Sequence, residues 1–121
     1  MRSAIIAMAC VIVVAAGTSA CVTTCTAEAR ASVVVTVVDA AEKVVTDAKV
    51  TFRVDGGVEQ KAECQGTYAN MCDKWHAGLE DSGTFVIVAT SADGTKRAEK
   101  TVVVKRDECH VQTELVMLVL E

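Results

Sequence analysis

The cysteines are the residues whose type and number most directly imply chemistry in this chain. There are six in 121 residues: Cys10, Cys21, Cys25, Cys64, Cys72 and Cys109. In an exported protein such cysteines form disulfides, whereas in a cytosolic protein they more often bind metal or take part in redox chemistry. A metal site would combine the thiols with His76 and His110. Zinc sites favour closely spaced ligands, and the spacings after Cys64 are eight and thirty-seven residues. We therefore predict disulfides, without metal or cofactor.

The first twenty residues have the three parts of a cleavable secretory signal. Arg2 supplies the positive charge, residues 4–16 form an apolar stretch, and residues 17–20 are small. The apolar stretch is thirteen residues long, whereas a membrane-spanning helix needs about 20. We predict a signal peptide over residues 1–20 and export of the rest of the chain.

Cys21 follows directly on the small residues of this segment. The Ala20-Cys21 junction resembles the lipobox of bacterial lipoproteins, in which the cysteine becomes the lipidated N-terminus, although Thr18 stands where that family usually has Leu. Cleavage removes Cys10, so an even set of four thiols remains if Cys21 carries lipid. We predict a lipid anchor on Cys21 in the bacterial cell envelope, at the outer membrane or the periplasmic face. Cleavage by ordinary signal peptidase, which gives a secreted protein, is the alternative.

The four remaining cysteines allow three sets of pairs. A Cys64–Cys72 bond would be local and would close the loop that contains Tyr68. A Cys25–Cys109 bond would then tie the segment after the signal to the start of the last strand. The sequence alone leaves these sets open.

Valine-rich and alternating segments predict strands. Val50, Phe52 and Val54 share one face of a segment whose other face is polar, which is the period of a half-buried strand. Turn signals such as Asp55-Gly56-Gly57 separate the segments. Seven strands are expected, at residues 32–39, 48–55, 58–64, 74–79, 84–90, 95–105 and 109–120. In the last of these, alternate residues from Val111 to Val119 share a face. This pattern predicts an all-β fold, an antiparallel β-sandwich of about seven strands, Ig-like or transthyretin-like. Residues 21–31 are interpreted as a lipidated tether and residues 32–121 as the domain.

Charge and motifs limit the functional classes. The formal net charge is −4 and the acidic residues are scattered, which argues against a nucleic-acid partner. His76 and His110 are expected on the surface, and no nucleophile or phosphate-binding motif accompanies them. We predict that the protein is not an enzyme. Tyr68 and Trp75 are a possible binding surface for a glycan or a peptide, although Trp75 is better interpreted as covering one end of the core.

Several segments resemble a known family. The strands VVVTVVDA and DAKVTFRV, the segment AGLEDSGTFVIVAT and the closing VVVKRDECHVQTELVMLVL are similar to the carboxypeptidase regulatory-like domain, over residues 32–120. Gly83-Thr84-Phe85 and the Asp93-Gly94 turn carry the resemblance, whereas residues 40–43 lack the usual glycine-proline turn. The resemblance implies a transthyretin-like sandwich that acts as a non-catalytic accessory module.

The predicted function combines these expectations. The protein is expected to be a non-catalytic cell-envelope lipoprotein that binds or spaces an unknown envelope protein or glycan. The alternative is a secreted, unlipidated adhesin or inhibitor that recognises a protein or glycan through its loops.

Overall fold

The computed structural model describes residues 11–15, 18–22, 24–66 and 71–121. Within these ranges the chain is all-β, and no helix is long and apolar enough to cross a membrane. In chain order the strands are β1 (Val11–Ala15), β2 (Thr18–Val22), β3 (Ala31–Asp39), β4 (Lys49–Val54), β5 (Gln60–Lys61), β6 (Glu63–Gln65), β7 (Lys74–Leu79), β8 (Gly83–Thr90), β9 (Arg97–Val104) and β10 (Glu114–Leu120).

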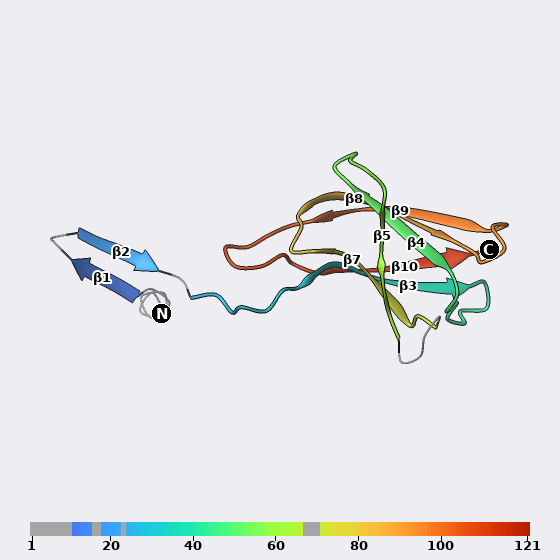
Figure 1. Ribbon diagram of the computed structural model, residues 1–121, viewed down its shortest axis with the longest axis horizontal. Helices are drawn as coiled ribbons and strands as arrows, with labels where there is room; N and C mark the ends of the chain where they lie inside the picture. The colour runs from blue at the N-terminus through green and yellow to red at the C-terminus, as the bar shows by residue number, and fades with distance from the viewer. Residues whose placement is uncertain (1–10, 16–17, 23, 67–70) are drawn as a thin grey trace.

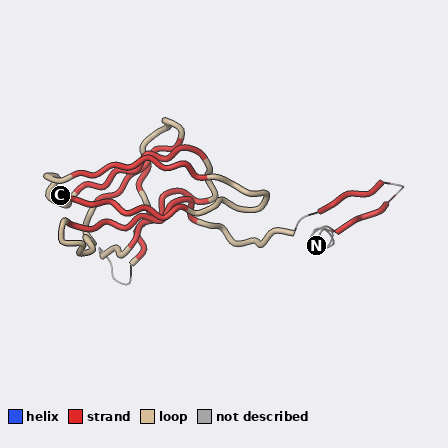
Figure 2. Tube along the Cα trace, turned by 180° about the vertical axis from the view of Figure 1, so that it is seen from behind, coloured by secondary structure: helices blue, strands red, loops and turns tan. Residues whose placement is uncertain are grey.

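Eight of these strands form two packed sheets (Figure 1). One sheet has the order β10-β3-β7-β6 and the other the order β5-β4-β8-β9. Loops gather at the two ends of this sandwich, as the view from behind also shows (Figure 2). The predicted all-β sandwich is confirmed.

The core lies between the two sheets, and alternation along the strands builds it. Val33, Val35 and Val37 of β3 are fully buried, and β-branched side chains of this kind pack well on a pleated surface. In β4, Val50 and Phe52 are buried, as the period of two predicts. Other core residues come from β7, β8 and β10: Trp75, Ala77, Phe85, Ile87, Ala89, Val116, Leu118 and Leu120.

The strand count differs from the prediction at residues 58–64. That segment forms two short strands instead of one: β5 pairs with β4, whereas β6 pairs with β7 in the opposite sheet. Ala62 lies between them and packs against the core, and its N–H donates to the carbonyl of Val50 (2.9 Å). The chain therefore changes sheets at Ala62, and the sandwich has eight strands rather than seven.

The last strand also differs from the prediction in direction. β10 runs parallel to β3, in a sandwich whose other strand pairs are antiparallel. The reason is the connection over residues 105–113, which leaves β9 in one sheet and enters β10 in the other. This connection turns back at the end where β3 begins, so β3 and β10 start side by side.

The prediction that alternate residues from Val111 to Val119 share one face of the last strand is wrong. Val111 is 1% exposed, whereas Leu115 and Met117 are 80% and 57% exposed. Val111 forms an isolated bridge with Arg106, and the regular strand begins only at Glu114. The irregular residues between them shift the alternation by one position, so the buried face of β10 is that of Val116.

The predicted signal peptide is described only in part. Residues 1–10 and 16–17 lie outside the described ranges, and β1 pairs with β2 as an antiparallel hairpin. In Figure 1 this hairpin lies away from the sandwich, joined to it by the chain after residue 23.

Candidate functional site

The structure selects one of the three possible sets of disulfides. Cys25 bonds to Cys109 and Cys64 bonds to Cys72, with Cα atoms 5.3 Å apart in each pair. The predicted disulfides are confirmed, and the pairing that the sequence left open is now assigned. The four thiols are therefore not available as metal ligands, and among the described residues no cluster of histidine, cysteine and acidic side chains could hold a metal ion.

The two aromatic residues proposed as a binding surface do not come together as one. Trp75 is 3% exposed and belongs to the core cluster, so its indole cannot contribute to a surface patch. Tyr68 lies outside the described residues. The interpretation of Trp75 as a core residue agrees with the structure.

A polar cluster lies where the segment after β2 joins the sandwich. We call it the Glu80 cluster and define it as Glu80, His110, Thr26 and Arg106. Glu80 follows β7 directly and has a positive φ of 55°, a backbone conformation that costs free energy in a non-glycine residue. A residue in this conformation needs surrounding contacts to keep it there, and Glu80 makes several hydrogen bonds.

The carboxylate of Glu80 joins three parts of the chain. Its Oε2 accepts hydrogen bonds from the backbone N–H of Arg30 (3.0 Å) and from Nδ1 of His110 (2.6 Å), and its Oε1 accepts one from the N–H of Val111 (3.1 Å). The backbone N–H of Glu80 donates to the carbonyl of Arg30 (2.9 Å), and Nη1 of Arg106 donates to the carbonyl of Glu80 (2.9 Å). Glu80 is thus the point at which residues 25–31, the end of β7 and the connection before β10 meet.

The tautomer of His110 follows from these partners. An ionised carboxylate only accepts hydrogen bonds, so Nδ1 of His110 donates to Glu80. In the neutral ring Nε2 then accepts, and the hydroxyl of Thr26 lies 2.8 Å from it as the donor. Each polar atom of the imidazole therefore has a partner, which explains how a side chain in a residue only 6% exposed is accommodated.

Asp107 builds the turn that places Cys109 and His110. Its Oδ1 accepts the backbone N–H of both residues at 2.8 Å, and its own N–H donates to the carbonyl of His110 (2.9 Å). The hydrogen bond from the N–H of His110 lowers the pKa of the Asp107 carboxyl, and that of Cys109 adds to the effect. The ionised form of Asp107 is therefore the one that holds this turn.

The pKa of Glu80 is lowered too, so the ionised form of this carboxyl is the one that holds the cluster. The hydrogen bond from His110 holds the pKa of the Glu80 carboxyl below its ordinary value of 4.5, burial opposes this shift, and the N–H groups of Val111 and Arg30 add to it. The carboxylate is ionised at neutral pH and keeps its three donors.

Thr26, His110 and Glu80 place a hydroxyl, an imidazole and a carboxylate in a row. A hydrolase catalytic triad has the same order of groups. In this protein, however, both oxygens of Glu80 are held by backbone N–H groups that join separate segments. Four shallow hollows on the described surface are lined by other residues. The arrangement therefore favours a structural role, in which Glu80 holds separate segments of the chain together. The absence of enzymatic activity stays a prediction.

No protein-family model, curated protein or solved structure matches this chain. The resemblance to the carboxypeptidase regulatory-like domain consequently stays a prediction.

Sequence reasoning missed the Glu80 cluster. His110 was expected on the surface and is buried, whereas His76 is partly exposed in β7. Glu80 and His110 are thirty residues apart, and neither belongs to a recognisable motif. One signal was present: His110 immediately follows Cys109, so a bond between Cys109 and Cys25 would bring both the histidine and Thr26 to one place.

Replacing Glu80 by glutamine is expected to lower the free energy of unfolding at neutral pH and to lower it by a smaller amount in acid. The folded pKa of Glu80 lies below the unfolded one, so its contribution is present above about pH 4.5 and is lost as the pH falls through the folded value. Urea unfolding of both proteins from pH 7 to pH 2 measures this difference. The matched control is Glu59→Gln, at an exposed carboxylate whose Oε1 lies 3.7 Å from Nη2 of Arg53. If the variant lost the same free energy of unfolding at every pH, the ionised carboxylate would not be the group that stabilises the cluster.

Proposed function

We propose that this chain is a non-catalytic bacterial cell-envelope lipoprotein, in which residues 1–20 direct export, Cys21 carries the lipid, and the sandwich is a binding or structural module. One observation carries the proposal. The two disulfides use every cysteine that follows Cys21. Removal of the signal takes Cys10 away, so Cys21 of the mature chain has no cysteine left to pair with. Lipidation gives that thiol a chemical role in a compartment where disulfides persist.

The arrangement of the core supports a removable N-terminal segment. Every buried residue in the described part of the sandwich lies at Ser32 or later. Cleavage after Ala20 therefore removes none of the described core, and it leaves both disulfides intact. The Glu80 cluster begins at Thr26 and is also retained.

The alternative is a secreted adhesin or inhibitor that recognises a protein or glycan through its loops, and Tyr68 and Trp75 are the residues named as a possible binding surface. The burial of Trp75 takes away half of that surface. No other described feature favours this alternative over an anchored module.

Mass spectrometry of the mature N-terminus tests the proposal. The full gene is expressed in a bacterial host, and the protein is purified from its envelope fraction. We expect a chain that begins at Cys21 and carries a diacylglyceryl group, and we expect Cys21→Ser to leave the membrane fraction. A mature chain with an unmodified Cys21, or one that retains residues 1–20, would contradict the proposal. The folded Cys25–Cys109 and Cys64–Cys72 bonds, mapped by peptide analysis of the same sample, control for misfolding.

A further inference from the structure

The chain between the anchor position and the sandwich is shorter than the sequence suggests. Residues 21–31 were expected to act as a tether. However, Cys25 is bonded to Cys109, and the hydroxyl of Thr26 lies within hydrogen-bond distance of His110. The backbone N–H of Arg30 donates to the carboxylate of Glu80, and the carbonyl of Arg30 accepts the backbone N–H of Glu80. Residues 25–31 are thus part of the folded domain, and only three residues separate Cys21 from Cys25.

The length of the chain limits how far the sandwich can lie from the anchor position. An extended chain spans at most about 3.4 Å per residue, so the four steps from Cys21 to Cys25 reach about 14 Å. The Cα atoms of Cys25 and Cys109 are 5.3 Å apart, which places Cys109 within about 19 Å of the Cα of Cys21. Without the disulfide and the Glu80 cluster, ten steps would separate Cys21 from Ala31, and the free reach would be about 34 Å.

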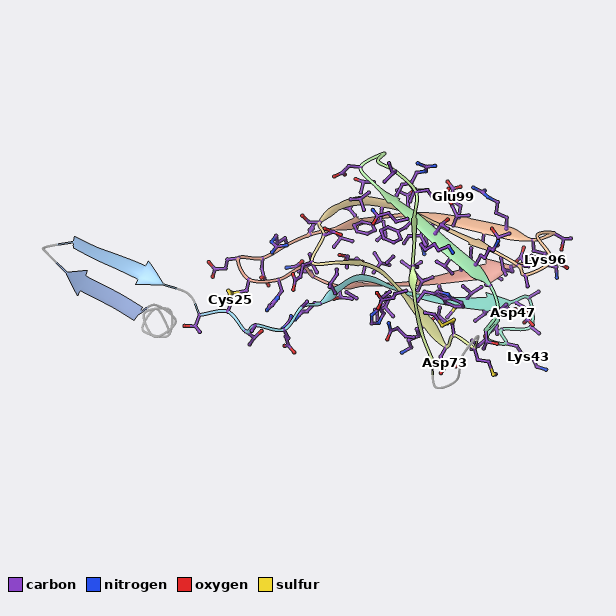
Figure 3. All side chains as sticks on the ribbon, in the orientation of Figure 1. Cys25, Lys43, Asp47, Asp73, Lys96 and Glu99 are labelled. Atoms are coloured by element: carbon purple, nitrogen blue, oxygen red, sulfur yellow. A yellow bond between two sulfur atoms is a disulfide. The ribbon has the colours of Figure 1, made fainter. Side chains whose placement is uncertain are left out.

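The disulfide also fixes which end of the sandwich is held. Cys25 lies where the incoming chain meets one end of the sandwich, and Lys43, Asp47 and Lys96 lie at the other end of the sandwich (Figure 3). The loop of residues 105–110, which contains Cys109, extends from the first of these ends beside the incoming chain (Figure 1). We call it the anchor loop.

We propose that the anchor loop lies against the headgroups of the bilayer that holds the lipid, so that the partner of this end of the sandwich is the membrane surface itself. This inference rests on the proposed lipidation of Cys21. The sandwich then has a fixed orientation, with the far end, near Lys43 and Lys96, presented away from the membrane.

The surface chemistry of this end is compatible with headgroups and does not by itself decide the orientation. The anchor loop exposes charges of both signs, from Lys105, Arg106 and Asp107. Large apolar side chains are exposed at both ends, for example Leu79 near the anchor loop and Val44 far from it. The orientation therefore follows from chain length and the disulfide, and it does not require a particular lipid charge.

Amine footprinting of the vesicle-bound lipoprotein tests the inference. The full protein, lipidated in cells, is reconstituted into phosphatidylcholine vesicles and treated with a bulky membrane-impermeant amine reagent. Labelling of Lys105 and Lys43, both exposed in the fold, is then compared by mass spectrometry. We expect Lys105 to be labelled several-fold less than Lys43 on vesicles, and the two to be labelled alike once the domain is released by proteolysis after Cys21.

An insertion variant is the matched control. Twelve Gly/Ser residues placed after Thr24 leave both disulfides and the Glu80 cluster unchanged and add about 20 Å of average reach. We expect this variant to lose the protection of Lys105. Equal labelling of the two lysines in the lipidated wild type, or equal protection of Lys105 in the insertion variant, overturns the inference and leaves the lipoprotein proposal standing. A protein that does not associate with vesicles overturns both.

Discussion

Replacing Cys25 and Cys109 together by serine is expected to lower the free energy of unfolding by about 4–5 kcal/mol. The bond joins residues 84 positions apart, and closing a loop of this length removes chain entropy worth about 4.6 kcal/mol from the unfolded state. Small domains are stable by only about 5–15 kcal/mol in total. The expected loss is therefore a large fraction of the total free energy of unfolding. Urea unfolding at a low temperature measures it.

The second disulfide supplies the comparison. Cys64 and Cys72 are eight positions apart, and the same chain-entropy argument gives about 2.5 kcal/mol for their bond. We expect the double serine variant of that pair to lose about half as much stability. If the local pair matters as much as the distant pair, loop entropy is not the source of the stabilisation, and the contacts that each bond fixes would have to account for it.

The parts of this fold that could be predicted from sequence depend on local patterns. The alternation of Val50 and Phe52 with Lys49 and Arg53 identifies β4 because a half-buried strand has a period of two. The run of valines identifies β3, because β-branched side chains favour strands, although its partners were not specified. Exposure on the outer face of β10 was missed because a few irregular residues after Val111 shift the period.

Features that depend on distant residues could not be obtained in this way. Four cysteines limit the disulfides to three sets, and only the packing of the strands selects one of them. The parallel pairing of β10 with β3 follows from a connection that changes sheets, for which the sequence has no local signal. The Glu80 cluster is the clearest example, because each of its polar residues is ordinary in its own segment and gains its role from a residue at least 26 positions away.

Phe85→Ala is the second substitution with a large expected effect, a loss of about 3–5 kcal/mol of unfolding free energy. The ring of Phe85 is fully buried in β8 and stacks on Phe52, with ring centroids 5.7 Å apart. The backbone of β7 approaches the ring closely at Gly78, where a Cβ atom would lie 3.0 Å from Cε2 of Phe85 and φ is +80°. A glycine at this point leaves room for the ring, and an alanine at position 85 leaves a cavity that a backbone held in two sheets cannot close.

Two controls distinguish loss of packing from a general effect of shortening a side chain. Val103→Ala, on a residue 55% exposed in β9, is expected to change stability by no more than about 0.5 kcal/mol. In a double-mutant cycle, Phe52→Ala and Phe85→Ala are expected to be non-additive by about 0.5–1.5 kcal/mol, because the two rings contact each other. Additive losses, or a Phe85→Ala loss as small as that of Val103→Ala, would mean that the stacked pair is not at the centre of the core and that the two sheets are held together elsewhere.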